Sequence, residues 1–541
     1  MNIEETLKLK IQSALKGYNL SLELSDIIIE NTKNKELGDY ATNVALKSAS
    51  RLGKKPRDFA LELVEVIDKE GIDKIEVAGP GFINFFLKKD TINSAISMII
   101  AKGDDYGRGE KKNKKINVEF VSANPTGDLH LGHARIAAVG DSICRVYDFA
   151  GYDVDREYYL NNCGNQVATL AMSLNIRYHQ LFGEKVELPE DSYHAHDIID
   201  IATEFKNTYG DKYLDNSKET LDFMMEYGIE KEFEKIKRDL ESFRTSFDIY
   251  TKESDVRKDN HVQDVLKNKF AKYTYVLDSA TFLKTTDFLD DKDRPVVKSD
   301  GQFTYLMPDI AYHLDKLSRG YDLLVDVLGA DHHGYINRMK SALMMQGYSK
   351  DVLEVELVQI VRLIKDGKEM KMSKRTGAGI TLRELCEDVG VDAVRYFFVS
   401  RAASSHLDFD LDLATEKSSS NPVYYAQYAH ARLCNVLEKS SDIEIDLSAK
   451  NLKEPAEVEL IKCLLDFPRL VETSAANREP NLIATYIQRL AGFVHAFYSE
   501  CRVIDRDNLD VTSSRLALVK ACQIVLKNAL TLIGVSAPKK M

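Results

Sequence analysis

The sequence INVEFVSANPTGDLHLGHARIAAVGDSICRV, at residues 116–146, decides the fold. It begins with an apolar strand over Ile116–Val121, turns at Asn124–Gly127 and continues as a helix with an apolar face over Ile136–Val146. A second strand pattern follows over Val154–Leu160. This order of strand, helix and strand predicts a βαβ unit, in which a helix covers two parallel strands.

A second unit of the same kind lies further along the chain. Leu323–Leu328 reads as a strand, Tyr335–Met345 as a helix and Val355–Ile364 as another strand. Two such units predict an α/β fold with a parallel, Rossmann-like sheet as its catalytic core. The helix-rich, strongly charged stretch at about 167–268 separates the two units, and we interpret it as an insertion.

The two ends of the chain differ from this core. The first part alternates amphipathic helices with short strands around the turn Gly79-Pro80-Gly81, which predicts a small N-terminal α/β domain. After Leu411 helical periodicity alone continues to the end, which predicts a C-terminal all-α helical bundle. The expected domains are 1–110, 112–410 with the insertion, and 411–541. In the first domain we expect helices over Val44–Leu52 and Phe59–Ile67 and strands over Ile75–Val77 and Ile83–Leu87.

Composition restricts the class of protein. The chain has 541 residues, 44% of them hydrophobic, and its formal net charge of −12 does not favour indiscriminate binding of nucleic acid. No apolar run is long enough to cross a membrane and the start has no secretory pattern, so we expect a cytoplasmic protein without membrane contacts. We also expect a monomer. Seven cysteines without a C-x-x-C pair argue against a disulfide framework and against a structural zinc site.

His130, Gly132 and His133 form an H-x-G-H motif where the helix of the first unit begins. The first turn of a helix offers unpaired amide groups and the positive end of the helix dipole, and both attract phosphate. The two imidazoles add hydrogen-bond donors, and Gly132 leaves room for a nucleotide against the backbone. The alternative is a pair of structural or helix-capping histidines. The position favours a nucleotide site, because open α/β sheets bind ligands at the carboxyl ends of their strands.

A basic, glycine-containing segment follows the strand that ends near Ile364. Its central residues are Lys371, Met372, Ser373 and Lys374. The next helix opens with Thr381 and Glu384 in capping-box spacing, which would fix one end of the segment. Such a loop can close over a nucleotide and stabilise the charge that develops in a transition state. A solvated basic loop is the alternative interpretation.

Together the two segments resemble the HIGH and KMSK motifs of class I aminoacyl-tRNA synthetases. Within that class the chain is similar to arginyl-tRNA synthetases, because EFVSANPTG at 119–127, YLMPDIAYH at 305–313 and GADHHG at 329–334 match that family's blocks. The resemblance covers almost the whole chain and includes VSAPKKM at 535–541. One departure is Lys374, since many members of the family lack this second lysine, and the adenylate chemistry is therefore expected to use Lys374 directly.

The resemblance implies a pocket for arginine built from Ser122, Asn124, Tyr305 and Asp309, with Glu119 near its floor. A guanidinium presents five donors in a planar fork, so a selective pocket needs carboxylate and amide acceptors and an aromatic wall. Taken singly, Asp309 is explained equally well as a helix N-cap, and Tyr305 as core packing.

The same resemblance assigns residues to ATP. Gly329, Asp331 and His332 would contact the nucleotide together with Gly132, Met372 and Ser373. Read without the resemblance, Asp331-His332-His333 suggests a metal cluster. That interpretation is disfavoured, because adjacent histidines point in different directions and no further ligands recur at suitable spacing.

The RNA contacts implied by the resemblance lie in both terminal domains. Tyr425, Tyr428 and Arg432 share one helical face and would stack on unpaired bases of the tRNA, although such a stripe also suits a helical core. The N-terminal domain would touch the tRNA elbow, where Lys54, Lys55 and Arg57 form a basic group. Taken alone, that group is better explained as a solvated charge run.

The function implied is ATP-dependent ligation of L-arginine to the 3′ end of tRNA(Arg), with release of AMP and pyrophosphate and with ATP entering as its Mg²⁺ complex. His130, His133, Lys371 and Lys374 are the expected catalytic residues. Family resemblance further implies that activation needs bound tRNA and that no editing domain exists.

Two other functions remain open at this point. A nucleotidyltransferase acting on a small molecule shares the H-x-G-H element, but it needs no long helical C-terminal domain. An RNA-binding relative that has lost catalysis should have eroded motifs, whereas both histidines and both lysines are present.

Overall fold

The computed structural model describes residues 3–32, 35–370 and 379–541. These residues form two compact units, each assembled from three stretches of chain. The first comprises Met1–Asp104, Leu433–Leu465 and Phe493–Ile524, and the second comprises Asp105–Arg432, Asp466–Gly492 and Val525–Met541. Neither unit follows the expected boundary at 411, and the domains 1–110, 112–410 and 411–541 stay predictions.

The first unit contains an antiparallel sheet of four strands in the order β1-β2-β4-β3. The predicted hairpin and both predicted helices are present. The first helix and the first two strands were not anticipated. Within residues 3–102 the elements are α1 (Ile3–Lys16), β1 (Ile29–Asn31), β2 (Tyr40–Thr42), α2 (Val44–Ser48), α3 (Pro56–Val66), β3 (Ile72–Ala78), β4 (Phe82–Leu87) and α4 (Lys89–Lys102).

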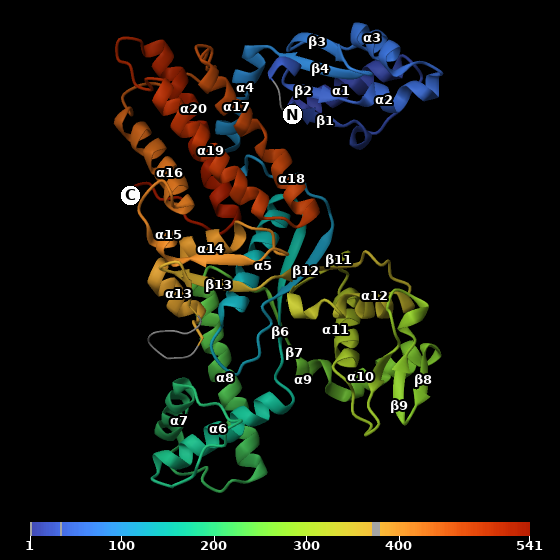
Figure 1. Cartoon of the computed structure of the whole chain (residues 1–541), viewed down its shortest axis with the longest axis vertical. Helices are drawn as coiled ribbons and strands as arrows, with labels where there is room; N and C mark the ends of the chain where they lie inside the picture. Colours follow the sequence, from blue (N-terminus) through green and yellow to red (C-terminus); the bar gives the residue numbers. More distant parts are fainter. Residues whose placement is uncertain (1–2, 33–34, 371–378) are drawn as a thin grey trace. The chain divides into compact units, whose positions relative to one another are not determined.

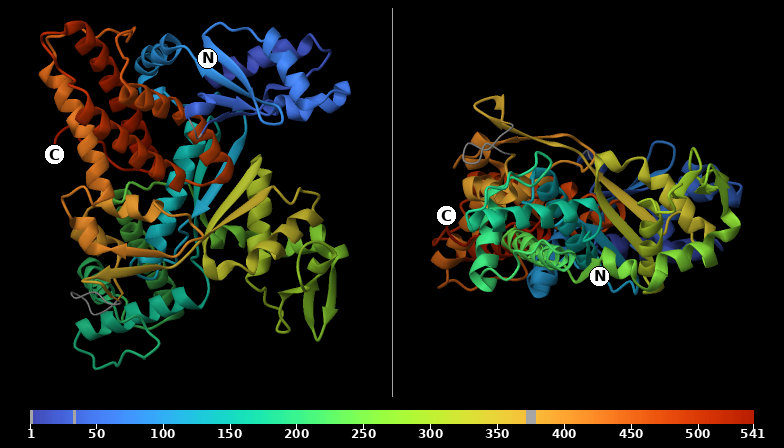
Figure 2. Two further views of the ribbon diagram at one scale, coloured as in Figure 1. Left: turned by 45° about the horizontal axis from the view of Figure 1, so that its top comes forward. Right: turned by 90° about the horizontal axis from the view of Figure 1, so that it is seen from below.

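The second unit is built on a parallel sheet of five strands in the order β12-β11-β5-β6-β7. The left view of Figure 2 shows strands of this sheet in teal and yellow. The predicted Rossmann-like α/β core is therefore confirmed. The order reverses between β5 and β11, and ligands bind at such a switch point in doubly wound sheets. The strands are β5 (Lys115–Phe120), β6 (Asp153–Leu160), β7 (Ile249–Lys252), β11 (Leu323–Gly329) and β12 (Leu353–Val358), and two connecting helices are α5 (Leu131–Phe149) and α12 (Tyr335–Met345).

The single strand predicted over Val355–Ile364 is wrong. The chain leaves the parallel sheet after β12 and enters a second sheet as β13 (Val361–Lys365), between β14 (Lys368–Glu369) and β15 (Leu407–Asp410). The break lies at Gln359, whose N–H donates to the carbonyl of Ala403 and whose carbonyl accepts from Arg135 Nη1 at 2.8 Å. Only two residues separate β12 from β13, so the sequence pattern does not reveal the exchange of hydrogen-bond partners.

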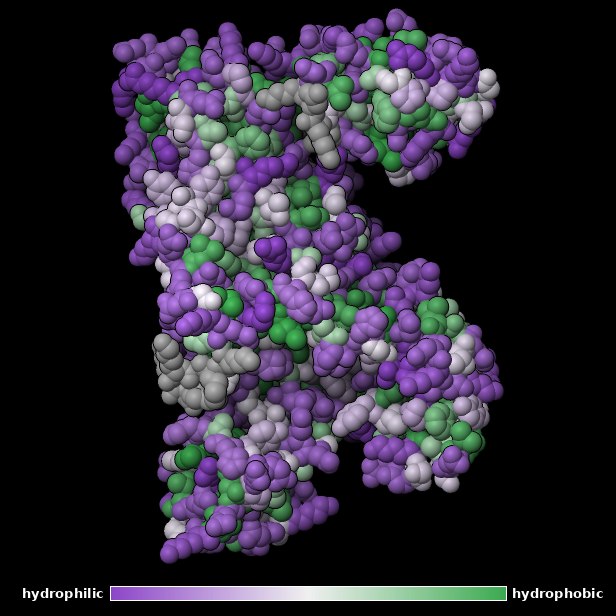
Figure 3. All heavy atoms as spheres, in the orientation of Figure 1, coloured by the Kyte–Doolittle hydropathy of each residue, from purple (hydrophilic) through white to green (hydrophobic). Residues whose placement is uncertain are grey.

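The predicted insertion is helical over α6 (Asn165–Leu181), α7 (His196–Tyr209) and α8 (Lys218–Ser242), and hydrophilic side chains predominate on the face of it shown at the bottom of Figure 3. Its expected end at about 268 differs from the structure, because β7 within that stretch joins the core sheet. The chain then forms α9 (Glu253–Val256), α10 (His261–Val265), an antiparallel sheet of β8 (Thr274–Leu277), β9 (Ala280–Leu283) and β10 (Arg294–Val297), and α11 (Leu306–Ser318).

From Leu411 on, the described residues form helices as predicted (Figure 1). Among the described residues, no helix is both long enough and apolar enough to cross a membrane. The helices after the lysine-bearing segment are α13 (Leu382–Val389), α14 (Val391–Val399), α15 (Leu411–Thr415), α16 (Pro422–Lys439), α17 (Pro455–Leu465), α18 (Phe467–Asn477), α19 (Asn481–Glu500) and α20 (Leu509–Leu532).

Candidate active site

His130 caps the helix that follows the first strand of the core sheet. Its Nδ1 accepts hydrogen bonds from the backbone N–H groups of Gly132, at 3.0 Å, and His133, at 3.4 Å. Because Nδ1 accepts, the neutral ring carries its proton on Nε2 and presents a donor there. A Cβ atom at Gly132 would lie 2.9 Å from this ring, so glycine is required beside it. Helix capping therefore occupies only the Nδ1 edge of His130, and the Nε2 edge is available to a ligand.

The rings of His130 and His133 are stacked, with centres 3.7 Å apart and planes inclined by 22°. Burial lowers the pKa of His130, and burial together with the neighbouring His130 ring lowers the pKa of His133 to about 4. Both imidazoles are consequently neutral at pH 7 and act as hydrogen-bonding groups. Within the described part of the chain, the buried Nδ1 of His133 has no hydrogen-bond partner. A polar ligand at this position would satisfy that atom.

The turn between the first strand and this helix is strained. Val121 and Ser122 have φ values of 68° and 41°, in the left-handed region that a β-branched residue such as valine rarely adopts. Each such residue costs about 1–3 kcal/mol, and this strain is typical of functional sites. The turn places Ser122 so that its Oγ donates to Glu119 at 3.0 Å and accepts from the backbone N–H of Tyr159 at 3.0 Å. Ser122 therefore links the first two strands of the core sheet.

The segment after β11 lies next to the H-x-G-H segment, because β11 pairs with β5 and both strands point the same way. A Cβ atom at Gly329 would lie 2.6 Å from the carboxylate of Asp331, so a larger residue there would displace that side chain. Asp331 is exposed and His332 is half-exposed. Among the described residues, no group of three or more His, Cys, Asp or Glu side chains is arranged to hold a metal ion.

Lys371, Met372, Ser373 and Lys374 lie outside the described residues, but the residues that flank them are placed. Met370 donates its backbone N–H to Leu363 on β13 at 2.8 Å. On the other side, Thr381 forms an isolated antiparallel bridge with His130, and Leu382 donates to the carbonyl of Leu129 at 2.8 Å. The predicted capping box between Thr381 and Glu384 is confirmed. The chain therefore returns to the H-x-G-H helix directly after the lysine-bearing residues.

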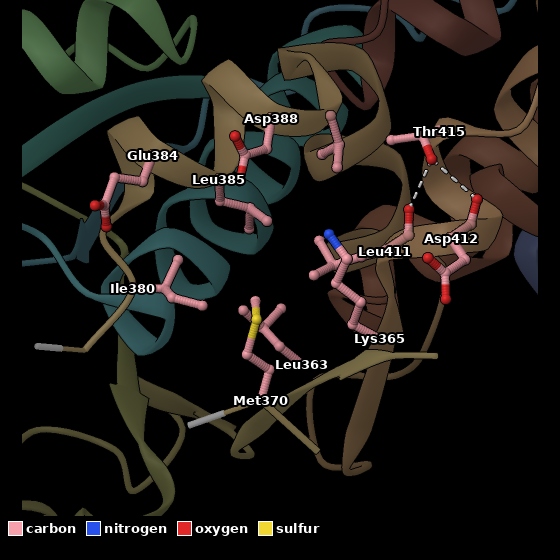
Figure 4. Close-up of a pocket in the computed structure, with 11 residues that line it drawn as sticks. Leu363, Lys365, Met370, Ile380, Glu384, Leu385, Asp388, Leu411, Asp412 and Thr415 are labelled. Atoms are coloured by element: carbon pink, nitrogen blue, oxygen red, sulfur yellow. Dashed lines mark hydrogen bonds between the residues drawn. The ribbon is translucent and has the colours of Figure 1, made fainter. Parts of the chain in front are cut away.

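The same two flanks border a cavity of about 350 Å³ (Figure 4). Met370 and Ile380 extend into it from the two flanks, and Leu385 of α13 and Leu411 of α15 add further apolar surface. Thr415 closes one side with hydrogen bonds to the carbonyls of its own helix. The cavity belongs to the packing of β13, α13 and α15 beside the site, and the carboxylates of Glu384, Asp388 and Asp412 in its wall do not suit a phosphate.

Asp309 is the carboxylate best placed to receive a cation. It lies half-buried in the first turn of α11, which begins at Leu306 with Tyr305 as its N-cap, so the N-cap interpretation of Asp309 is wrong. Burial raises the pKa of Asp309 to about 7, the carboxylates of Glu119 and Glu253 act in the same direction, and His313 acts against them. No hydrogen bond from a described residue reaches this carboxylate, whereas its own backbone carbonyl accepts from His313.

Glu119 already has cationic and neutral partners. Lys316 Nζ lies 2.5 Å from its Oε2 and 3.4 Å from Asp326, and the lysine side chain is completely buried. His313 Nε2 contacts Asp326 at 2.9 Å, which completes a buried network behind the pocket. Lys316 and Ser122 hold the two oxygens of the Glu119 carboxylate, so this network fixes its orientation. Sequence reasoning missed Lys316, because a lysine in an amphipathic helix ordinarily faces solvent.

The remaining predicted pocket residues lie at different places around Asp309. Asn124 Nδ2 donates to Gln166 at 2.5 Å. Tyr305 is 80% exposed, so it is not core packing, and it borders a separate cavity of about 470 Å³ together with Glu253 and Arg257. Figure 1 shows their elements, α9 and α11, close to the carboxyl ends of the core strands.

Two tyrosines that the sequence did not indicate also belong to this region. The hydroxyl of Tyr159 is buried without a hydrogen-bond partner among the described residues, and its ring packs on Tyr312 with centres 4.7 Å apart. Burial, and the charge of Asp309 among others, raises the pKa values of Tyr159 and Tyr335 well above the usual range. Both hydroxyls therefore stay protonated. In the sequence each is an ordinary aromatic residue, Tyr159 near the end of β6 and Tyr335 at the start of α12.

The helical face predicted for RNA lies on α16. Tyr428 is 43% exposed and stacks on Tyr424, with ring centres 6.1 Å apart and planes inclined by 7°. Arg432 is also exposed on α16. Tyr425 instead points its hydroxyl toward Gly492 of α19, 3.9 Å from where a Cβ there would lie. Tyr428 is therefore the exposed member of a stacked pair with Tyr424, and Tyr424 and Tyr425 are both half-buried.

Comparisons with protein families cover nearly the whole chain. The family model described as the catalytic domain of class I (R) tRNA synthetases matches residues 95–397. The model for the arginyl-tRNA synthetase N-terminal domain matches residues 5–87, and the model for the DALR anticodon-binding domain matches residues 426–541.

Individual relatives agree with these matches. The arginine–tRNA ligase of Shouchella clausii (strain KSM-K16) is 49% identical over 551 residues, which covers 99% of each chain. The arginine–tRNA ligase of Bacillus subtilis (strain 168) is 47% identical over 556 residues and covers both chains completely. Among solved structures, the arginyl-tRNA synthetase of Thermus thermophilus superposes with a TM-score of 0.77 over 99% of each chain at 20% identity, a likeness of fold alone.

Proposed function

The chain belongs to the arginyl-tRNA synthetase family of class I aminoacyl-tRNA synthetases, and from this premise we propose which of its residues carry out the ligation of arginine to tRNA. Its substrates are arginine, ATP and tRNA. We assign ATP to the site as its Mg²⁺ complex, and tRNA(Arg) as the acceptor. The enzyme would work in the cytoplasm as a monomer, where its seven free thiols stay reduced.

The reaction proceeds in two steps. The carboxylate of arginine attacks the α-phosphorus of ATP, forming arginyl-adenylate and releasing pyrophosphate. A ribose hydroxyl of the terminal tRNA adenosine then attacks the arginyl carbonyl, and AMP leaves. No side chain acts as a nucleophile, so the enzyme accelerates the reaction by positioning the substrates and by stabilising charge.

The neutral histidines would donate hydrogen bonds to the phosphates. The proton on His130 Nε2 faces away from the helix that Nδ1 caps, and the buried Nδ1 of His133 lacks a described partner. Hydrogen bonds from neutral rings strengthen as negative charge grows on the departing pyrophosphate, which favours the transition state over the ground state. Gly132 and Gly329 would let the nucleotide approach the backbone, with Asp331 and His332 near its ribose.

Lys371 and Lys374 would neutralise the phosphates from the other side, and Met372 and Ser373 would line the nucleotide between them. Support comes from the flanking residues, since Thr381 pairs with His130 and brings the chain back to the H-x-G-H helix. Lysine is a compact cation with a flexible stem and suits such a contact.

The observation that carries the assignment of arginine is the Asp309 carboxylate. It is half-buried, has no described hydrogen-bond partner and lies near the carboxylates of Glu119 and Glu253. Lys316 neutralises Glu119, whereas Asp309 has no ion pair among the described residues and His313 offsets only part of the effect of its burial. A guanidinium would supply both the missing charge and paired donors. The site leaves buried acceptors unpaired when a smaller amino acid enters, which explains selectivity without an editing domain.

Recognition of tRNA would use α16 and the N-terminal basic group. The stacked pair Tyr424 and Tyr428, together with Arg432, suits unpaired bases. Tyr425 would support this face from behind. Lys54 is held by Glu62 and by the Tyr18 ring, while Arg57 binds the carbonyl of Gly79, so these cations have defined positions for contact with a phosphate backbone.

Pyrophosphate exchange with arginine tests this proposal. We expect arginine to stimulate exchange of labelled pyrophosphate into ATP only when tRNA(Arg) is present. Free lysine should not stimulate the exchange under the same conditions. Exchange that depends on a different small acid would favour a nucleotidyltransferase instead. Absence of exchange, together with retained binding of tRNA, would indicate a relative without catalysis.

A further inference from the structure

Helix α8 of the insertion contacts both chain segments that border the proposed site. Lys235 Nζ lies 3.1 Å from Oδ1 of Asp128, two residues before the first histidine of H-x-G-H. One helical turn further along, Asp239 accepts hydrogen bonds from Nε and Nη2 of Arg383, at 2.9 and 2.8 Å. Arg383 lies in the first turn of α13, and Figure 1 shows α8 running from the insertion to that helix.

The two segments held by α8 are also paired with each other. His130 bridges Thr381, and Leu382 donates to the carbonyl of Leu129. Continuing the same antiparallel register brings Asp128 opposite Arg383. The ammonium of Lys235 therefore meets an aspartate on one segment, and the carboxylate of Asp239 meets an arginine on the other.

The contacts of Lys235 are largely shielded from water. Its side chain is 12% exposed and also contacts Asp197 of α7, at 2.5 Å, and Glu232 of α8, at 2.9 Å. Glu232 is completely buried. Removing one partner from a buried ionic group leaves an uncompensated charge, so such a group holds one arrangement firmly. The buried ammonium of Lys235 joins the insertion to the H-x-G-H segment through Asp128, whose side chain is 39% exposed.

We propose that Lys235 and Asp239 are positioning residues for adenylate formation, and that α8 fixes the distance between the H-x-G-H turn and the start of α13. The inference rests on the proposed function, because it gives the charged insertion a role in that same site. Neither side chain touches substrate. Each acts through a backbone segment, and a displacement of about 1 Å at reacting groups can cost about 100-fold in rate.

The test compares substitutions on α8 in pyrophosphate exchange at saturating tRNA. We expect Lys235→Met and Asp239→Asn each to lower kcat by about 10- to 100-fold, with the KM for arginine changed by less than about twofold. Lys235→Arg should recover a large part of kcat, because it keeps the charge. The matched control is Lys237→Met, since Lys237 lies on the same helix with its ammonium near the Phe233 ring, 5.0 Å from its centre.

A reciprocal exchange covers the case in which a single variant folds poorly. Arg383→Asp should lose activity, and Arg383→Asp combined with Asp239→Arg should regain kcat by about tenfold or more, because the pair is restored with opposite polarity. The proposal is overturned if Lys235→Met and Asp239→Asn, folded by circular dichroism, turn over like Lys237→Met. It is equally overturned if the double variant regains its melting temperature but not kcat. Failure of the wild-type protein to exchange pyrophosphate with arginine would instead remove the proposed function.

Discussion

His130 and Thr381 lie opposite each other in an antiparallel bridge, and each is the N-cap of a helix. The starts of α5 and α13 therefore meet at one place although they are far apart in the sequence. The positive dipole ends of two helices converge there. This convergence offers a triphosphate partial positive charge from the backbone in addition to any side chain.

Substitution of His130 separates helix capping from catalysis. Asparagine caps helices well, whereas alanine at an N-cap costs about 1 kcal/mol, so His130→Asn should melt near the wild-type temperature and His130→Ala should melt lower. If Nε2 donates to the phosphates, both variants should lose about 100-fold in kcat for pyrophosphate exchange. If His130→Asn turned over at the wild-type rate, His130 would act only as a helix N-cap and not as a donor to the phosphates.

Lys374→Ala should lower turnover more than it weakens ATP binding. The ammonium would act on charge that appears only in the transition state, so we expect kcat to fall by about 100-fold with a modest change in the KM for ATP. Lys368→Ala, at an exposed position on β14, is the matched control. A rise in the KM for ATP with kcat unchanged would mean that Lys374 merely binds the nucleotide.

The KM for arginine should depend on pH through Asp309. Burial raises the pKa of this carboxyl to about 7, and a guanidinium binds its ionised form. Below pH 7 the proton must leave first, so KM should rise about tenfold per pH unit as pH falls and should level off above pH 7. Asp309→Asn should raise KM and abolish this slope, while the KM for ATP stays constant. Isothermal titration in two buffers should detect the released proton, and a flat pH profile in the wild type would contradict this assignment.

Local patterns predicted those parts of the site that depend on neighbours in sequence. The βαβ units, the H-x-G-H helix start and the Thr381 capping box follow from periodicity and from side chains a few residues apart. The capping role of His130 was one of two interpretations, and the ring geometry supports both at once.

Features fixed by distant partners could not be predicted. Lys316 is buried only because Glu119 and Asp326 come from two adjacent strands, and the pattern of its own helix contains no sign of them. The left-handed backbone at Val121 contradicts the preference of valine and is imposed by the surrounding fold. Likewise, the chain between β12 and β13 is held by Arg135, which belongs to the distant helix α5.

Recognition of tRNA should depend on the stacked tyrosine pair of α16, of which Tyr428 is the exposed member. Tyr428→Ala removes a stacking surface worth about 1–3 kcal/mol per base, so the KM for tRNA should rise by about tenfold with little change in kcat. Tyr348→Ala is the control, since that tyrosine is similarly exposed, at 38% against 43%. Identical aminoacylation kinetics for the two variants would remove this face from the tRNA interface.

Stability should vary with pH through Glu232 on α8. Burial raises the pKa of this carboxyl from 4.5 to about 7, and the charge of Lys235 only partly opposes that effect. Between pH 4.5 and 7 the folded protein therefore binds more protons than the unfolded chain, and the free energy of unfolding should fall as pH rises, by up to about 3 kcal/mol. Glu232→Gln removes this titration. The variant should match the wild type near pH 5 and exceed it at pH 8 in urea denaturation. Glu230→Gln, exposed on the same helix, should show no such difference, and a Glu232→Gln effect of equal size at both pH values would mean that the carboxyl stays ionised throughout.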